Sequence, residues 1–190
     1  MAAIDEATAA EAAGQRLLLA GDPDAAAPHL AAAAAAYRSA WELGRPVSVG
    51  RLSGLLKAAV LAGDVADPRA AAAYALAQLP AEARSPSAAY VRALAAAITG
   101  DGDALAAAAE AMRTGDGPFE RAADALAAIA ARDATAFRLA VEAIVADFAA
   151  RPAHLTGVAI ADTAAMLQRL GATAGVAADV RSPLLPPPAT

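Results

Sequence analysis

The stretch GPFERAADALAAIAARDATAFRLAVEAIVADFA, residues 117–149, decides the fold class of this chain. Apolar side chains recur in both of its halves, mostly three or four residues apart, which is the spacing of one face of an α-helix. Only the short Ala131-Arg132-Asp133 turn separates the two stripes, so the stretch predicts two antiparallel helices in a hairpin. The stripe residues are Phe119, Ala122, Leu126 and Ile129 in the first half and Phe137, Val141, Ile144, Val145 and Phe148 in the second.

Turns of the same kind occur earlier in the chain. In each turn, a residue that can end one helix in the left-handed conformation, usually glycine, is followed by an aspartate that can cap the next helix. The four turns are Gly21-Asp22, Gly63-Asp64, Gly100-Asp101 and Arg132-Asp133. Their aspartates are 42, 37 and 32 residues apart, which is near the tetratricopeptide period of about 34 residues but less regular. We therefore expect an irregular tetratricopeptide-like stack of antiparallel helical hairpins, with an unrelated α-bundle as the alternative.

Composition favours an all-α fold along the whole chain. Alanine, the best helix former, dominates, and β-branched residues are sparse outside short patches. We expect one helical domain over residues 1–175. The proline-rich tail, residues 176–190, should run extended, either over a helix face or free. The nine expected helices cover residues 3–20, 24–43, 48–62, 68–79, 86–99, 103–114, 118–131, 134–149 and 155–170.

Charge, cysteine content and hydropathy exclude several function classes. With 15 Lys and Arg against 20 Asp and Glu, the net charge is -5, so we expect a basic partner rather than nucleic acid. The chain has no cysteine for disulfides, thiolate catalysis or zinc ligation, which fits a reducing cytoplasm. Before the tail, no uncharged run, including Ala70 to Ala81, is long enough to span a bilayer. Acidic residues stand where an export signal would be basic, so we expect a cytoplasmic protein without a membrane partner.

The sequence contains no convincing catalytic or metal-binding motif. Asp101-Gly102-Asp103 is similar to the start of a calcium loop, but Leu105 and Met112 stand at later ligand positions, so helix capping explains it better. His29 and His154 are far apart and have no neighbouring histidine, so neither indicates a metal site. The phosphate-binding glycine fingerprints and the serine nucleophile elbow are both absent. We expect no cofactor and no enzyme activity; an enzyme with a site assembled between helices is the weaker alternative.

The candidate partner-binding residues are one aromatic side chain with its neighbour and the acidic side chains of the turns. Trp41 shares an apolar helix stripe with Tyr37, which favours core packing. An exposed tryptophan beside Arg45 would instead be an interface anchor. Acidic side chains at the turns come together only if the hairpins stack in register, and would then steer a basic partner. The candidates are Trp41, Arg45, Asp22, Asp24, Asp64, Asp67, Asp101 and Asp103.

Features of the second half of the chain, residues 117–188, carry a family resemblance. They are the hairpin from Phe119 to Phe137, the segment Ile160-Ala161-Asp162-Thr163-Ala164 with Leu170-Gly171, and the ending Val180-Arg181-Ser182-Pro183-Leu184-Leu185-Pro186. In these features the chain resembles the immunity protein 49 family, all-α proteins encoded in bacterial polymorphic-toxin loci. The resemblance implies a cytoplasmic protein that binds and neutralises a cognate toxin. It supplies no catalytic motif to carry over.

Two functions are therefore open. The first is an immunity-type inhibitor whose acidic turns face a basic toxin. The second is a general tetratricopeptide-like scaffold or adaptor that self-associates or binds a peptide in a concave groove. The second function predicts exposed aromatic or arginine side chains on the concave face, and a homo-oligomer is possible in either case.

Overall fold

The computed structural model describes residues 3–44 and 48–188 and confirms an all-α fold. Within these residues the regular structure consists of nine α-helices and one short 3-10 helix, with no strand. The elements are α1 (Ala3–Leu19), α2 (Pro23–Leu43), α3 (Gly50–Ala62), η1 (Gly63–Ala66), α4 (Pro68–Gln78), α5 (Pro86–Thr99), α6 (Gly102–Met112), α7 (Gly117–Ala131), α8 (Ala134–Ala149) and α9 (Asp162–Thr173).

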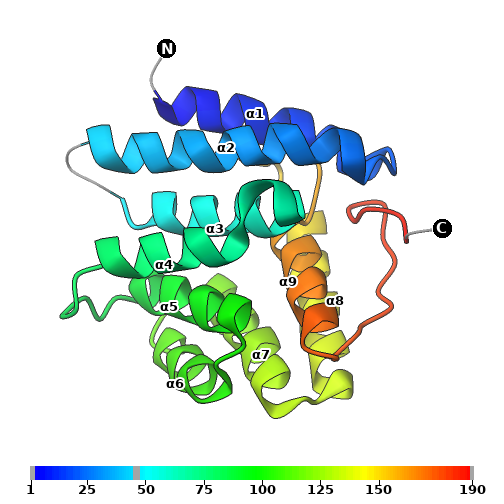
Figure 1. Ribbon diagram of the computed structural model, residues 1–190. Helices are drawn as coiled ribbons and strands as arrows, with labels where there is room; N and C mark the ends of the chain where they lie inside the picture. Colours follow the sequence, from blue (N-terminus) through cyan, green and yellow to red (C-terminus); the bar gives the residue numbers. More distant parts are fainter. Residues whose placement is uncertain (1–2, 45–47, 189–190) are drawn as a thin grey trace.

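From α1 to α8, each α-helix packs against the next one along the chain, which gives the predicted stack of hairpins. Figure 1 shows α1 and α2 together along one side of the molecule, with α3 to α6 following beneath them. The last helix breaks this order, because α9 packs against α3 and α7 as well as against its neighbour α8. It therefore connects α3 to the C-terminal end of the stack, α7 and α8. The likeness to tetratricopeptide repeats stays a prediction.

Three of the four predicted turns have the expected geometry. Gly21, Gly100 and Arg132 have φ angles of 80°, 82° and 54°, which lie in the left-handed region. The aspartate that follows each of them accepts a hydrogen bond from a backbone N–H of the next helix. The donors are Ala25 N (3.0 Å from Asp22), Ala104 N (3.0 Å from Asp101) and Ala136 N (2.9 Å from Asp133).

The fourth turn differs from the prediction. Gly63 has a φ of 63°, but it begins η1 instead of leading directly to a helix cap. Asp64 lies inside η1, and the cap of α4 is Asp67, whose carboxylate accepts from Ala70 N at 3.0 Å. The proline at position 68 explains the shift, because proline is favoured at the first position of a helix and fixes where α4 begins.

The predicted helix at 155–170 was wrong at its start. Residues 150–161 form an irregular connection, and α9 begins only at Asp162 and ends at Thr173. Gly157 has a φ of 71°, outside the helical region, and the alternate residues Val158 and Ile160 are both buried. Alternating burial is typical of an extended segment, so these apolar residues fill the core without a helix.

The tail packs against the helical stack as far as it is described. The Gln168 side chain of α9 donates hydrogen bonds to the backbone oxygens of Ala178 and Val180, at 3.1 and 3.3 Å. The backbone N–H of Ala161 donates to Leu184 O at 2.8 Å, and Leu185 is buried. Of the two expectations for the tail, packing over a helix therefore holds. The division at residue 175 stays a prediction.

Close packing of helices in this alanine-rich core depends on a few glycines. Gly171 of α9 faces the ring of Phe137 on α8. A Cβ at this position would lie 2.6 Å from Phe137 Cε1 and 2.6 Å from the backbone oxygen of Val176. Both distances are too short for real contacts, so glycine is required here.

Among the described residues, no helix is both long and apolar enough to cross a membrane.

We expect Gly171→Ala to destabilise the protein by about 1–3 kcal/mol, although alanine is normally the better helix former. The reason is overpacking against a backbone oxygen that has little freedom to move. The control is Gly102→Ala in α6, where an added Cβ meets no atom within 4 Å. Urea unfolding checks both variants. An unfolding midpoint of Gly171→Ala equal to or above that of Gly102→Ala would contradict the packing argument.

Candidate functional site

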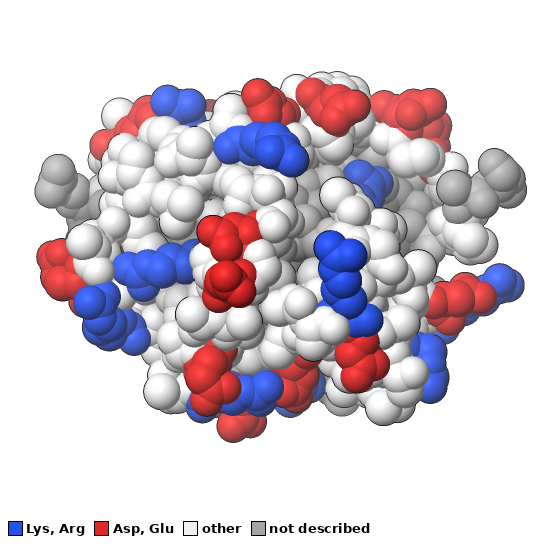
Figure 2. Space-filling model, turned by 60° about the horizontal axis from the view of Figure 1, so that its bottom comes forward, with Lys and Arg blue, Asp and Glu red and all other residues white. Residues whose placement is uncertain are grey.

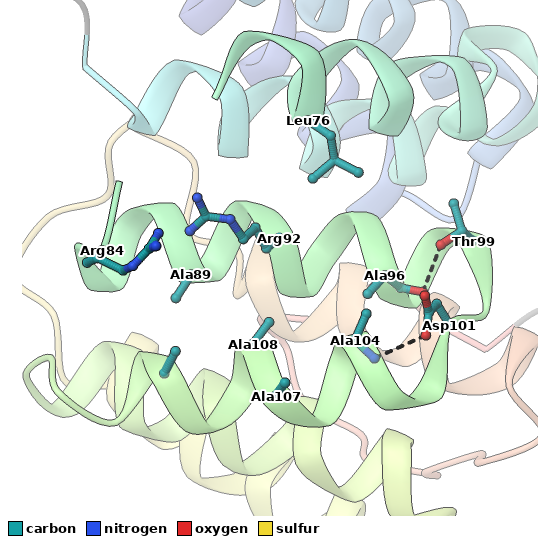
Figure 3. A pocket seen from close by; sticks show the side chains of 11 residues that line it. Leu76, Arg84, Ala89, Arg92, Ala96, Thr99, Asp101, Ala104, Ala107 and Ala108 are labelled. Atoms are coloured by element: carbon teal, nitrogen blue, oxygen red, sulfur yellow. Dashed lines mark hydrogen bonds between the residues drawn. The ribbon is translucent and has the colours of Figure 1, made fainter. Parts of the chain in front are cut away.

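A groove of about 460 Å³ lies on the surface between α4, α5 and α6. In Figure 3, Leu76 points toward it from α4, and alanines of α5 and α6 form its floor. Arg84 and Arg92 stand toward one end of the view, and Thr99 and Asp101 stand at the other. The lining residues are Leu76, Arg84, Ala89, Arg92, Ala96, Thr99, Asp101, Ala104, Ala107, Ala108 and Ala111.

The two ends of the groove carry opposite charge. Arg92 donates hydrogen bonds to the backbone oxygens of Ala83 (2.8 Å) and Pro80 (3.1 Å), and Arg84 donates to Ala81 O at 2.6 Å. These bonds fix the guanidinium groups, but backbone oxygens do not neutralise their charge. Within the described residues, neither arginine forms a salt bridge, and neither does Asp101 at the other end.

The structure places the predicted acidic turns at the same end of successive hairpins. In Figure 1 the turns α1–α2, α3–α4 and α5–α6 lie at the right-hand ends of the helices that they join, the last two near the middle of the view, whereas the α4–α5 turn lies to the left. This follows from the antiparallel order, in which every second turn falls at the same end of a stack. All six predicted acids on these turns are exposed, and none is in a salt bridge with a described residue. They are Asp22, Asp24, Asp64, Asp67, Asp101 and Asp103.

Acidic side chains do not dominate every face. The face in Figure 2, reached by turning the bottom of Figure 1 forward, carries acidic and basic side chains in alternation, with uncharged surface between them.

The predicted aromatic candidate is neither a core residue nor a free anchor. Trp41 is partly buried against the core, and its indole N–H donates to Gln78 Oε1 at 3.3 Å. Nearby, the Arg38 guanidinium lies 4.0 Å from the centre of the Tyr74 ring, and Glu42 accepts from both of these side chains. Arg45 lies outside the described residues.

A buried ionic cluster, which the sequence did not predict, lies at the junction of α1, α2, α3 and α9. Its centre is Lys57, the only lysine in the chain. The ammonium Nζ lies 2.5 Å from Asp162 Oδ2 and 3.1 Å from Glu11 Oε1. Tyr37 donates its hydroxyl hydrogen to Glu11 Oε2 at 2.6 Å, and Glu11 is fully buried. One cation is thus shared by two carboxylates from opposite ends of the sequence.

Further polar groups extend this cluster toward a small pocket. Gln15, also fully buried, donates to Asp162 Oδ2 at 3.3 Å and accepts from the Thr156 hydroxyl at 2.5 Å. The pocket beside them encloses about 180 Å³ and lies between α3, the C-terminal end of α8, the 150–161 connection and the start of α9. Its polar lining consists of Lys57, Arg151, His154, Thr156, Asp162 and Thr163.

The environment of the cluster keeps Lys57 and Tyr37 protonated. Burial lowers the pKa of Lys57, but the carboxylates of Asp162 and Glu11 raise it by more, so the pKa lies above its ordinary value. Burial, with the charge of Glu11 beside it, raises the pKa of Tyr37. On α5, burial also raises the pKa of Tyr90, which is not a member of the cluster, to about 12. A lysine held as an ammonium has no lone pair, so at neutral pH Lys57 cannot act as a nucleophile or a general base.

The cluster was missed because its members are far apart in sequence. Lys57 and Asp162 are separated by 105 positions, and no local pattern links them. The sequence did contain one signal. Lys57 is the single lysine among fifteen Lys and Arg residues, which singles out its position as one where arginine is not used. In the part of the chain that the structure describes, no group of three or more His, Asp or Glu side chains is placed to hold a metal ion.

Comparison with protein-family models, curated proteins and solved structures gave no match to this chain.

Replacing Lys57 with methionine should destabilise the protein by about 3–5 kcal/mol, because it leaves two buried or nearly buried carboxylates without a cation. The matched control is Arg138→Met, which breaks an exposed helical pair with Glu142 and should cost about 0.5 kcal/mol or less. Chemical denaturation of both variants gives the comparison. Similar losses in the two variants would show that the ammonium has no special role in the core.

Stability should fall as the pH rises from about 10 toward 12, the range between the ordinary pKa of tyrosine and that of Tyr90. In this range the unfolded chain releases protons that the folded chain keeps, so the unfolded state is favoured. Tyr90→Phe removes one such group and should make the decline shallower. Unfolding free energies measured across this range check the sign. An unchanged slope in Tyr90→Phe would mean that Tyr90 does not contribute.

Proposed function

We propose that the chain is a non-catalytic protein-binding module of the bacterial cytoplasm, an immunity protein that binds and neutralises a cognate toxin. The observation that supports this proposal is the set of exposed acids without salt bridges on three turns that lie at the same end of successive hairpins. The resemblance to the immunity protein 49 family supplies the kind of partner. The acids supply the surface to which that partner would bind.

The charge of these turns gives the proposal a physical mechanism. The net charge of the chain is -5, so a basic protein is attracted from a distance. Carboxylates concentrated at one end also orient the encounter, which raises the association rate more than the final affinity. Three of the acids, Asp22, Asp67 and Asp101, use one oxygen to cap a helix and are therefore held in fixed positions.

A general scaffold or adaptor is the second candidate, and the groove between α4, α5 and α6 is the observation that favours it. The scaffold hypothesis predicted arginines on a concave face, and Arg84 and Arg92 line this groove.

The small pocket beside the ionic cluster, with its convergent polar groups, is the feature that an enzyme would need. Lys57 and Gln15 both donate hydrogen bonds to Asp162 beside this pocket, which favours a structural role for these side chains.

The proposal is tested by co-purifying the chain with the protein encoded by the adjacent gene, titrating the pair and measuring growth rescue. The triple variant Asp24→Asn, Asp64→Asn, Asp103→Asn removes three acids from the turns without touching a capping side chain. We expect it to slow association on the order of tenfold at low salt, with a smaller effect at high salt.

The matched control is Glu82→Gln, Asp116→Asn, Glu120→Gln, which makes the same change in net charge at exposed acids outside these turns. It should bind nearly as fast as the unmodified chain. If both triple variants slowed association equally, the acidic turns would have no special role in binding the toxin. Absence of binding and of rescue with the unmodified chain would overturn the immunity function itself.

A further inference from the structure

The groove between α4, α5 and α6 has a floor that another helix can approach closely. Ala104, Ala107 and Ala111 of α6 are exposed and recur at intervals of three and four residues along one face. Alanine side chains allow helix axes to approach to about 8 Å, the lower limit for packed helices. Leu76 is the one large apolar side chain in the lining, and it is 44% exposed.

The charges at the ends of the groove are complementary to those of a second, reversed copy. Arg84 and Arg92 give one end positive charge, and Asp101 gives the other end negative charge. If a two-fold axis crosses the middle of the groove, the positive end of the groove in each copy faces the negative end of the groove in the other copy. The same axis makes the facing α6 helices antiparallel, so their dipoles also attract.

We infer that this groove is a self-association surface, in which a second copy of the chain lies reversed about a two-fold axis that crosses the middle of α6. Ala107 is at the centre of the alanine row from Ala104 to Ala111, and it lies next to this axis. The two copies of Leu76, which project toward the groove from α4, are covered by the pairing. The inference concerns this groove alone and does not depend on the toxin partner.

Sedimentation equilibrium of the unmodified chain, of Ala107→Glu and of Ala106→Glu tests the inference. Both alanines are exposed on α6, but only Ala107 lines the groove. We expect a reversible dimer for the unmodified chain and for Ala106→Glu. In Ala107→Glu two like charges face each other beside the axis, and the dissociation constant should rise by at least about tenfold.

Three outcomes would overturn the inference. The first is an unmodified chain that remains monomeric throughout the micromolar range. The second is a dimer that Ala107→Glu leaves intact, and the third is a dimer that both variants weaken equally. Circular dichroism of each variant shows whether it is folded, so loss of the dimer is separated from loss of structure. Because the acidic turns are unmodified in Ala107→Glu, toxin binding by this variant is a separate test of the proposed function.

A second experiment uses the absence of cysteine from the chain. Ala107→Cys introduces a single thiol near the two-fold axis, and mild oxidation should give a disulfide-linked dimer. Ala106→Cys places its thiol on α6 outside the groove and should give no disulfide-linked dimer under the same conditions. Equal crosslinking of the two variants, or none with Ala107→Cys, would contradict the two-fold arrangement.

Discussion

The ammonium of Lys57 between the carboxylates of Glu11 and Asp162 is the contact on which the arrangement of the helices depends. It joins α3 to the first helix and to the last, whereas most other contacts join helices that are neighbours along the chain. A buried ion pair contributes little net stability, because desolvation offsets most of the attraction. Its main effect is on position. A shift of α9 by one turn would move Asp162 by about 5.4 Å and leave the charges separated.

The alanine-rich composition gives this constraint its importance. Small side chains pack helices closely but offer few distinctive shapes, so many slightly shifted packings have similar energy. Large buried side chains such as Phe137 and Leu126 define the packing where they occur, and Gly171 admits the ring of Phe137 at a close crossing. Elsewhere the polar contacts select the register. The same smooth alanine faces, left uncovered on α6, form the floor of the groove.

Local features of the sequence predicted most of the fold. The hairpin of residues 117–149 and the caps at Asp22, Asp101 and Asp133 follow from spacing and turn chemistry within a few residues. The start of α9 was placed too early because an apolar segment around Gly157 fills the core in an extended form. The acidic turns could be assigned to one end from the alternation of helices. The ionic cluster could not be predicted, since it joins residues of α1, α3 and α9 that only the complete packing brings together.

The position of Asp162 in the sequence also has a consequence for the order of events during synthesis. At about 5–20 residues per second, the 105 positions after Lys57 take roughly 5–20 s to translate. During this time α1, α2 and α3 can already pack, but Lys57 has only Glu11 as its carboxylate partner. Until Asp162 is made, the junction of the N-terminal helices therefore has only one of its two carboxylates. Arrival of α9 completes the junction, so the final docking of the molecule belongs to a late stage of its production.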